Sequence, residues 1–375
     1  MADKLELIKR NTEEIIQEDE LESLVKNGTP LRHYIGFEIS GLIHLGTGLM
    51  CMRKVVDFLD AGIECHILLA DWHTWINDKL GGDMKIIQEV AVGYFKEGLK
   101  ASIKCLGGDP DKVKFVLGSD LYHNNDEYWA TVIEVSKNIT LSRTLRSTSI
   151  MGRQEGENID FAKLIYPPMQ VADIFIQGLT IAHAGMDQRK AHVIMRDVAL
   201  KLNISPVLDN KGNKIKPIAI HHHLLLGLQK PAIWPISEEN IKEVWISAKM
   251  SKSKPESCIF IHDSADEIKR KINNAFCPEK EIGFNPILDW IKSLVFAGDG
   301  IVFSINRKVE HGGNVSYESY GELEEDFANE AVHPMDLKVA LTEFLVDLLA
   351  PVRQEFGTVE GKKMLSRMAE LSITR

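Results

Sequence analysis

Between residues 33 and 223, short runs rich in β-branched and aromatic residues alternate with longer stretches of helical periodicity, which limits the fold more than any other feature. The expected strands are His33–Glu38, Glu64–Ala70, Val113–Leu117, Thr180–Ala182 and Pro217–His221. Strands separated by helices imply right-handed crossovers and a parallel sheet covered by helices, so we predict an α/β fold. Ligands bind such sheets beyond the carboxyl ends of the strands, where we expect the functional residues.

The last third of the chain has a different pattern. Strand signals fade after about residue 263, and an apolar stripe between Leu337 and Leu348 predicts a helix that Pro334 opens. We therefore predict two domains, residues 1–258 and residues 259–375, the second mainly α-helical. Between the strands and the helices, residues 229–248 carry two prolines and mixed charge, which indicates an exposed excursion.

Composition excludes several classes of protein. Hydrophobic residues make up 44% and charged residues 26% of the chain, as in folded globular proteins. No run reaches the roughly 18 apolar residues of a membrane span, and the charged start, Met1 to Glu14, does not resemble a secretion signal, so we expect a cytoplasmic protein without a membrane partner. The net charge of −10 counts against DNA binding. Five irregularly spaced cysteines are expected to be buried thiols.

The first chemical motif follows the first predicted strand. Ser40 and Gly41 form a turn, and a helix opens at His44 with Gly46 and Gly48 in its first turns. Glycine weakens a helix, so its presence there needs a reason. A helix amino terminus presents free N–H groups and a positive dipole end that suit phosphate, and Gly46 would let an adenine ring lie against the backbone. A loose turn with a chance histidine is an equally good interpretation of this segment alone.

The second motif is Lys249-Met-Ser-Lys252-Ser253, in a predicted loop before the helical domain. Two lysines and two hydroxyls in five residues can close over a polyphosphate and neutralise the charge of a departing pyrophosphate. Considered alone, it is a short basic loop of low specificity.

A third pattern lies on the helix expected after Pro168. Its residues are apolar nearly all round, which marks a buried helix, yet Gln170, Asp173 and Gln177 share one face. Stranding a buried Asp costs several kcal/mol or shifts its pKa, so these side chains either form an internal network or line a ligand cavity. We favour the cavity.

Two further groups of residues stay open. His221, His222 and His223 suggest a metal, but neighbouring residues on a strand point to opposite faces, so at most two could share a ligand, and we expect no metal ligands from the protein. Asp71-Trp-His73 follows the second strand and is either part of a site wall or a helix cap.

The two motifs together, about 200 residues apart, resemble the two signatures of class I aminoacyl-tRNA synthetases. The segments Tyr34–Glu38, Tyr166–Asp173, Ala184–His192 and His333–Lys338 are similar to the archaeal tyrosyl-tRNA synthetases, and the resemblance covers nearly the whole chain. It implies a Rossmann-like catalytic domain, a helical anticodon-binding domain, a homodimer, and L-tyrosine, ATP with Mg²⁺ and tRNA(Tyr) as partners.

The resemblance also implies roles for individual residues. Those expected at the tyrosine are Tyr34, Gly36, Tyr166, Gln170, Asp173 and Gln188. Those expected at ATP are Glu38, His44, Gly46, Lys249, Ser251, Lys252 and Ser253, with His44, Thr47, Lys249 and Lys252 catalytic. Those expected at tRNA are Arg189, Lys190, His311 and Asp336, the last reading the first anticodon base. Thr47 departs from the family, which usually has a second histidine there; a hydroxyl donates a hydrogen bond but carries no charge.

Three alternatives stay open at this point. Tryptophan would satisfy Asp173 through its indole N–H but leave Tyr34 idle, which weakens a tryptophanyl-tRNA synthetase without excluding it. Another nucleotidyl transferase, such as a pantetheine-phosphate or nicotinamide nucleotide adenylyltransferase, shares the phosphate motifs but is usually shorter. A non-catalytic RNA-binding paralogue fits the change at Thr47, although it would have no use for Lys249 and Lys252.

Overall fold

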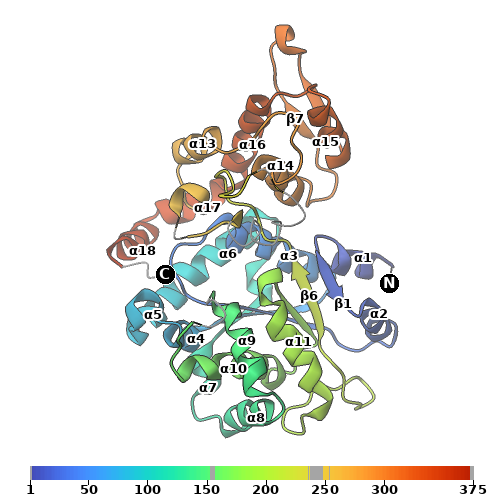
Figure 1. Ribbon diagram of the computed structural model, residues 1–375, viewed down its shortest axis with the longest axis vertical. Helices are drawn as coiled ribbons and strands as arrows, with labels where there is room; N and C mark the ends of the chain where they lie inside the picture. The colour runs from blue at the N-terminus through green and yellow to red at the C-terminus, as the bar shows by residue number, and fades with distance from the viewer. Residues whose placement is uncertain (1, 153–156, 235, 237–247, 253, 372–375) are drawn as a thin grey trace.

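The computed structural model describes residues 2–152, 157–234, 236, 248–252 and 254–371 (Figure 1). Its main sheet has six strands in the order β1-β6-β5-β2-β3-β4. They are β1 (Glu14–Ile16), β2 (Arg32–Phe37), β3 (Glu64–Leu69), β4 (Val113–Leu117), β5 (Ile181–Gly185) and β6 (Ile218–His222). The five predicted strands are confirmed to within three residues at each end, and they are parallel. The short strand β1 was not predicted; it pairs antiparallel with β6 at the edge.

The strand order creates a switch point beside β2. From β2 the chain moves outward through β3 and β4, then returns to the other side of β2 with β5 and β6. Crossovers on the two sides diverge there, leaving a crevice at the carboxyl ends of β2 and β5, where ligands of open α/β sheets bind.

Helices cover both faces of this sheet. They are α1 (Ala2–Lys9), α2 (Glu18–Lys26), α3 (Cys51–Asp60), α4 (Asp71–Ile76), α5 (Met84–Val90), α6 (Lys96–Cys105), α7 (Gly118–Tyr122), α8 (Asp126–Lys137), α9 (Leu141–Ser147), α10 (Ala162–Ile176) and α11 (Arg189–Val198). Alternate strand residues feed two buried clusters: Ile35 and Ile67 pack with α3, whereas Tyr34 and Leu68 pack with α10 and α11. The side chain of Tyr34 therefore lies on the α10 side of the sheet.

The later part of the chain is mainly helical, as predicted. Its helices are α13 (Ala265–Asn273), α14 (Pro286–Trp290), α15 (Tyr320–Ala328), α16 (Pro334–Leu348), α17 (Ala350–Gly357) and α18 (Val359–Glu370). Pro334 opens α16, which confirms that helix. A small hairpin, β7 (Phe303–Ile305) with β8 (Val315–Tyr317), was not predicted.

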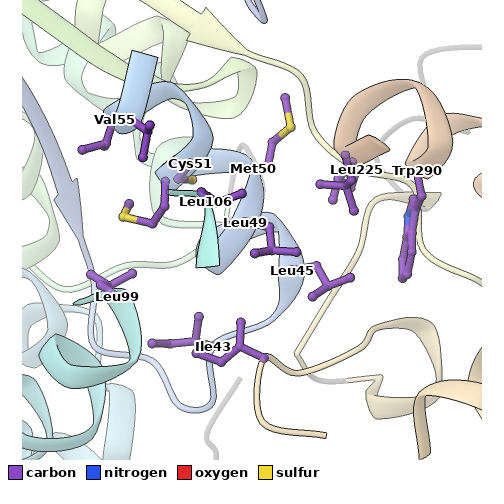
Figure 2. Packing of buried hydrophobic residues seen from close by; sticks show 14 of the residues in the cluster. Ile43, Leu45, Leu49, Met50, Cys51, Val55, Leu99, Leu106, Leu225 and Trp290 are labelled. Carbon is purple, nitrogen blue, oxygen red and sulfur yellow. The ribbon is translucent and has the colours of Figure 1, made fainter. Parts of the chain in front are cut away.

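The two parts of the chain share one buried core. Trp290 of α14 lies beside Leu225 (Figure 2), and its indole N–H donates to the carbonyl of Leu226 at 2.8 Å. Helix α17 packs on α6, and the ring of its Phe356 lies 5.3 Å from that of Tyr94, two residues before α6. The same buried cluster runs through both parts, and the domain boundary at residue 258 stays a prediction.

The cysteines correct one expectation. All five are free, and Cys51, Cys65 and Cys258 are buried, but Cys105 and Cys277 are only partly buried. These two still pack against the buried core, and sequence spacing alone does not distinguish a fully buried cysteine from a partly buried one. Within the described residues, no helix combines the length and the apolar character that crossing a bilayer demands.

Candidate active site

A cleft of about 530 Å³ opens at the switch point, at the carboxyl ends of β2, β5 and β6. Its lining contains every residue predicted for the amino acid: Tyr34, Gly36, Tyr166, Gln170, Asp173 and Gln188. It also contains those predicted for ATP and catalysis, apart from Ser253: Glu38, His44, Gly46, Thr47, Lys249, Ser251 and Lys252. Ser253 lies outside the described residues. One cleft therefore collects side chains that are far apart in the sequence, and its volume is in the ordinary range for small-molecule sites.

Asp173 lies on α10 at the bottom of the cleft and is fully buried. Its Oδ1 accepts a hydrogen bond from the hydroxyl of Tyr128 at 3.1 Å, whereas its Oδ2 has no hydrogen-bond partner within the described part of the chain. Burial raises the pKa of Asp173 to about 8, against the opposing effect of the neighbouring hydroxyls of Tyr122 and Tyr128. An unsatisfied buried oxygen costs about 1–3 kcal/mol, so Oδ2 is ready to form a hydrogen bond with a ligand hydroxyl.

Tyr34 approaches the cleft from β2 and depends on the glycine two residues later. The side chain of Tyr34 is 3% exposed, and burial raises its pKa well above the ordinary value. A Cβ at Gly36 would lie 2.5 Å from the Tyr34 hydroxyl oxygen. Only glycine at position 36 therefore permits this position of the phenol.

His73, which follows β3 on α4, completes the bottom of the cleft. Its Nε2 lies 3.6 Å from Oδ2 of Asp173, too far for a hydrogen bond, and has no partner among the described residues. Its ring is edge-on to the ring of Tyr166, with the two ring centroids 4.5 Å apart. Burial lowers the pKa of His73 to about 3, so the ring is neutral near pH 7. The Asp71-Trp-His73 segment thus supplies a wall of the site through His73.

The side chains predicted for the amino acid and for ATP are joined by hydrogen bonds. Tyr166 donates its hydroxyl to Oε1 of Glu38 at 2.7 Å, and the amide of Asn77 donates to both carboxylate oxygens of Glu38 at 3.0 and 3.2 Å. Burial raises the pKa of Glu38, while the hydrogen bond from Tyr166 lowers it. The two predicted subsites are therefore one continuous cavity with Glu38 between them.

The three polar residues that share one face of α10, Gln170, Asp173 and Gln177, have different surroundings. The amide of Gln170 donates to Oε1 of Gln188 at 3.3 Å, and Oε1 of Gln170 is buried without a partner in the described residues. Gln177 is outside the cleft lining; it donates to the carbonyl of Asp173 and contacts His66. The cavity interpretation thus holds for Gln170 and Asp173, and the network interpretation for Gln177. The helix also starts earlier than expected, at Ala162, with Pro167 and Pro168 inside it.

The predicted helix start forms the upper part of the cleft. His44 pairs with Phe260 in an isolated bridge, and the chain then enters a π-helical turn, η1 (Gly46–Met50), before α3. Burial, assisted by Lys252, lowers the pKa of His44 to about 3, so this side chain is neutral. A Cβ at Gly48 would lie 2.4 Å from Ile261, so close packing explains why position 48 is a glycine. Gly46 and Thr47 face the cleft.

The two lysines of the second motif approach the cleft from different sides. Lys252 donates to the hydroxyl of Ser40 at 3.0 Å, and burial lowers its pKa to about 8 despite the opposing charge of Glu38. Lys249 pairs with Asp187 at 3.4 Å. The carboxylate at position 187 follows β5, whereas Ser40 follows β2, so the lysines connect to both strands at the switch point.

Comparison with known proteins decides the family. A family model described as class I tRNA synthetases for tryptophan and tyrosine matches residues 26–350. The tyrosine–tRNA ligases of Thermococcus kodakarensis and Pyrococcus abyssi are 59% and 57% identical, covering 99% and 98% of both chains. A crystal structure of tyrosyl-tRNA synthetase complexed with L-tyrosine from Pyrococcus horikoshii is 55% identical with a TM-score of 0.95, covering 98% of this chain and 99% of that chain. The chain belongs to the archaeal-type tyrosyl-tRNA synthetases.

As a tyrosyl-tRNA synthetase, the chain is an enzyme, a class I ligase that depends on ATP. This sets aside the adenylyltransferase and the non-catalytic paralogue. A tryptophanyl-tRNA synthetase from Aeropyrum pernix has a TM-score of 0.63 at 17% identity, which shows a shared fold and nothing about the amino acid.

The residues predicted to bind tRNA lie outside the cleft of this tyrosyl-tRNA synthetase. Arg189 forms a bidentate ion pair with Glu14, and Lys190 donates to the carbonyl of Arg146. His311 lies in an exposed turn before β8, and Asp336 occupies the first turn of α16. Their roles stay predictions.

Four side chains of the tyrosyl-tRNA synthetase site were missed or left undecided by sequence reasoning: Asn77, His73, Tyr122 and Tyr128. His73 carried a positional signal, because it follows a predicted strand. Tyr128 is 45 residues from Asp173 and comes from another helix, so no spacing in the sequence connects them. Tyr122 is fully buried against Tyr128, with ring centroids 4.3 Å apart, and reads as an ordinary core residue.

Proposed function

We propose that the cleft binds L-tyrosine with its phenol directed at Asp173 and Tyr34, and ATP between the helix start at His44 and the lysines of residues 249–252. The observation that carries this proposal is Oδ2 of Asp173, a buried oxygen without a hydrogen-bond partner among the described residues. The phenol hydroxyl of tyrosine supplies that partner. Its oxygen in turn accepts from Tyr34, so the substrate hydroxyl would be fully paired.

Selectivity against phenylalanine follows from the same groups. A phenyl ring would leave Asp173 and Tyr34 without their partners in a buried site, and such unpaired groups reject a substrate far more strongly than a missing methylene does; this family is itself the usual illustration of that rule. Tryptophan remains the weaker candidate. Its indole N–H would satisfy Asp173 but offers no acceptor to Tyr34.

The polar end of the substrate would lie near Gln170, Gln188 and Tyr166. Oε1 of Gln170 is a second buried acceptor without a donor in the described residues, and an α-ammonium group is a strong donor. The substrate carboxylate would then lie beyond these residues, toward Glu38 and the helix start. This directs the nucleophile at the ATP half of the cavity.

In the first step, the tyrosine carboxylate attacks the α-phosphorus of ATP. The bond from that phosphorus to the bridging oxygen breaks, and tyrosyl adenylate and pyrophosphate result. No side-chain nucleophile is needed, so the protein contributes position and charge. Lys249 and Lys252 would neutralise the departing pyrophosphate, with the hydroxyl of Ser251 nearby and Ser253 also assigned to ATP. Thr47 would add a hydrogen bond to phosphate but no charge.

The donor set suits a magnesium ion held mainly by the substrate. Glu38 and Asp187 are carboxylates in the cleft lining, and no cluster of three potential ligands occurs among the described residues. Mg²⁺ typically binds one or two carboxylates together with phosphates and water. When bound, it would neutralise phosphate charge alongside the lysines.

In the second step, a ribose hydroxyl of the terminal adenosine of tRNA(Tyr) takes the tyrosyl group and AMP leaves. We assign Arg189 and Lys190 to the tRNA backbone, and His311 and Asp336 to the anticodon. The carboxylate of Asp336 can accept from the N–H groups of guanine, and His311 can stack on a base. We further propose that the enzyme works as a homodimer in the cytoplasm, where tRNA is charged for translation.

A pyrophosphate-exchange assay with tyrosine, tryptophan and phenylalanine in parallel tests the substrate. Exchange with tyrosine alone supports the proposal, whereas exchange with tryptophan alone overturns it. Asp173→Ala is expected to abolish the preference for tyrosine over phenylalanine. An unchanged preference in this variant would remove Asp173 from the pocket.

A further inference from the structure

Three histidines from neighbouring strands form a hydrogen-bonded row beneath α3. Nε2 of His33 on β2 lies 3.1 Å from Nδ1 of His183 on β5, and Nε2 of His183 lies 2.7 Å from Nδ1 of His222 on β6. His33 is level with Ile181, and His183 is level with Ile220. Each step of the row therefore crosses one strand and moves two residues toward the carboxyl edge of the sheet.

The row ends in the ATP half of the cleft. Nε2 of His222 lies 3.4 Å from Sγ of Cys51, and this thiol donates to the carbonyl oxygen of Gly46 at 3.2 Å. The same carbonyl accepts the backbone N–H of Cys51, which closes the π-helical turn. His222, Cys51 and Gly46 line the cleft, whereas His33 and His183 are fully buried behind it.

The direction of the hydrogen bonds can be assigned from the far end. Nδ1 of His33 is buried without a partner in the described residues. An orphaned N–H is rarer and costlier than an unused lone pair, so Nδ1 carries no proton. Nε2–H of each ring then donates to the next acceptor, through His183 and His222 to the sulfur of Cys51. Burial keeps all three rings neutral: it lowers the pKa of His33 and His183 well below the ordinary value and that of His222 to about 3.

Helix α3 rests on this row at two places. Cys51 contacts His222. Seven residues later, on the same face of the helix, Phe58 packs on His33 and His183, with ring centroids 4.6 and 5.7 Å apart. The nitrogen atoms pair one after another, His33 with His183 and His183 with His222, and do not converge on one point. The row therefore has the geometry of a hydrogen-bond chain.

We propose that His33, His183 and His222 are positioning residues for ATP, which act through the Cys51 thiol on the Gly46 carbonyl. Apolar packing has no preferred direction, and a π-helical turn is wide and unusual, so packing alone does not fix where the glycine backbone lies. A fully satisfied hydrogen-bond chain does, because each bond is directional. This inference rests on the proposed placing of ATP against Gly46.

The test uses His183, which is outside the cleft lining and cannot touch a ligand directly. In the full-length His183→Leu variant, we expect the KM for ATP in pyrophosphate exchange to rise about five- to tenfold, the effect of roughly one lost hydrogen bond, while the KM for tyrosine and kcat change little. His183→Gln, which keeps an amide donor, should recover part of the ATP affinity. A merely structural role would lower the melting temperature without separating the two KM values.

His192→Leu is the matched control. His192 is a buried histidine that pairs with His221 at 3.0 Å on the opposite face of the sheet. This variant removes the same kind of contact and should destabilise the fold similarly, but it should leave the KM for ATP unchanged.

Two further measurements test whether the histidines act on Gly46 through Cys51. Cys51→Ala cuts the end of the row, so adding His183→Leu to it should raise the KM for ATP no further; additive effects would overturn the proposal. If His183→Leu does not fold, ¹⁵N spectra of the native histidines provide the answer, since Nδ1–H tautomers in the row would contradict it. An unchanged KM for ATP in a folded His183→Leu variant overturns this inference alone. Absence of tyrosine-dependent exchange in the native enzyme would overturn the proposed function instead.

Discussion

Nε2 of His73 and Oδ2 of Asp173 face each other 3.6 Å apart at the bottom of the cleft, and within the described chain neither atom has a hydrogen-bond partner. Both side chains are essentially buried. The protein thus maintains two unsatisfied polar atoms at one place, which is the condition under which a hydroxyl-bearing ligand gains most on binding. We expect this arrangement to lower the stability of the empty enzyme.

The first prediction concerns that cost. The folded chain keeps the proton of Asp173 up to about pH 8, whereas an unfolded Asp loses it near 3.8. The folded state therefore binds more protons between these values, and the free energy of unfolding contributed by this group falls as pH rises, by up to about 1.4 kcal/mol per pH unit. Asp173→Asn does not titrate. We therefore expect the free energy of unfolding of this variant to exceed that of the parent by more at pH 8 than at pH 5.5. Urea unfolding without tyrosine measures both values. An equal difference at the two pH values would contradict the prediction.

The second prediction concerns the hydroxyl that holds the carboxylate. Tyr128→Phe removes the donor to Oδ1 of Asp173 but keeps the ring stacked on Tyr122. We expect the KM for tyrosine to rise roughly five- to tenfold, because the carboxylate loses a fixed orientation. Tyr317→Phe is the matched control: Tyr317 donates to Asp326 at 2.8 Å in the C-terminal part, and its loss should not affect the KM for tyrosine.

The third prediction uses the close approach at position 36. Gly36→Ala places a methyl group 2.5 Å from the Tyr34 hydroxyl, so the phenol must move. The KM for tyrosine should increase at least about fivefold, as expected for a lost hydrogen bond, with the KM for ATP unchanged. Gly321→Ala in α15, where nothing lies within 4 Å of the added carbon, should leave both values unaffected. Equal effects of Gly36→Ala on the two substrates would count against separate subsites.

The fourth prediction concerns the charge of Lys252. Because burial lowers the pKa of Lys252 to about 8, the ammonium is present below that value and is lost as pH rises through it. At saturating tyrosine, kcat/KM for ATP should therefore decline between about pH 7.5 and 9. Lys252→Arg keeps its charge throughout this range and should remove the decline. A decline that persists in the arginine variant would assign the titration to another group.

The sequence predicted the parts of this enzyme that depend on local patterns. Alternating hydrophobic runs located five strands, and the lysine motif and the glycine-containing helix start identified residues that line one cleft at the switch point. Strand β1 was missed because three residues carry too little periodicity, and it is defined by pairing with β6. The hairpin β7–β8 is equally short.

The rest of the site depends on tertiary contacts that a linear pattern does not record. Whether Asp173 or Gln177 lines the cavity is decided by what packs against each turn of α10. Tyr128 reaches Asp173 only because α8 packs on α10. The row from His33 to Gly46 requires three strands in register, which no single segment encodes.

The contact of α17 with α6 has a consequence for biosynthesis. Phe356 covers Tyr94. The hydroxyl of Tyr94 in turn accepts a hydrogen bond from the backbone N–H of Ile43 at 2.9 Å, just before His44. More than half of the polypeptide separates these surfaces, so emerging chains expose an apolar face until translation is nearly finished. Contacts of such long sequence separation slow folding. Nascent-chain protection by a chaperone would matter most during that interval.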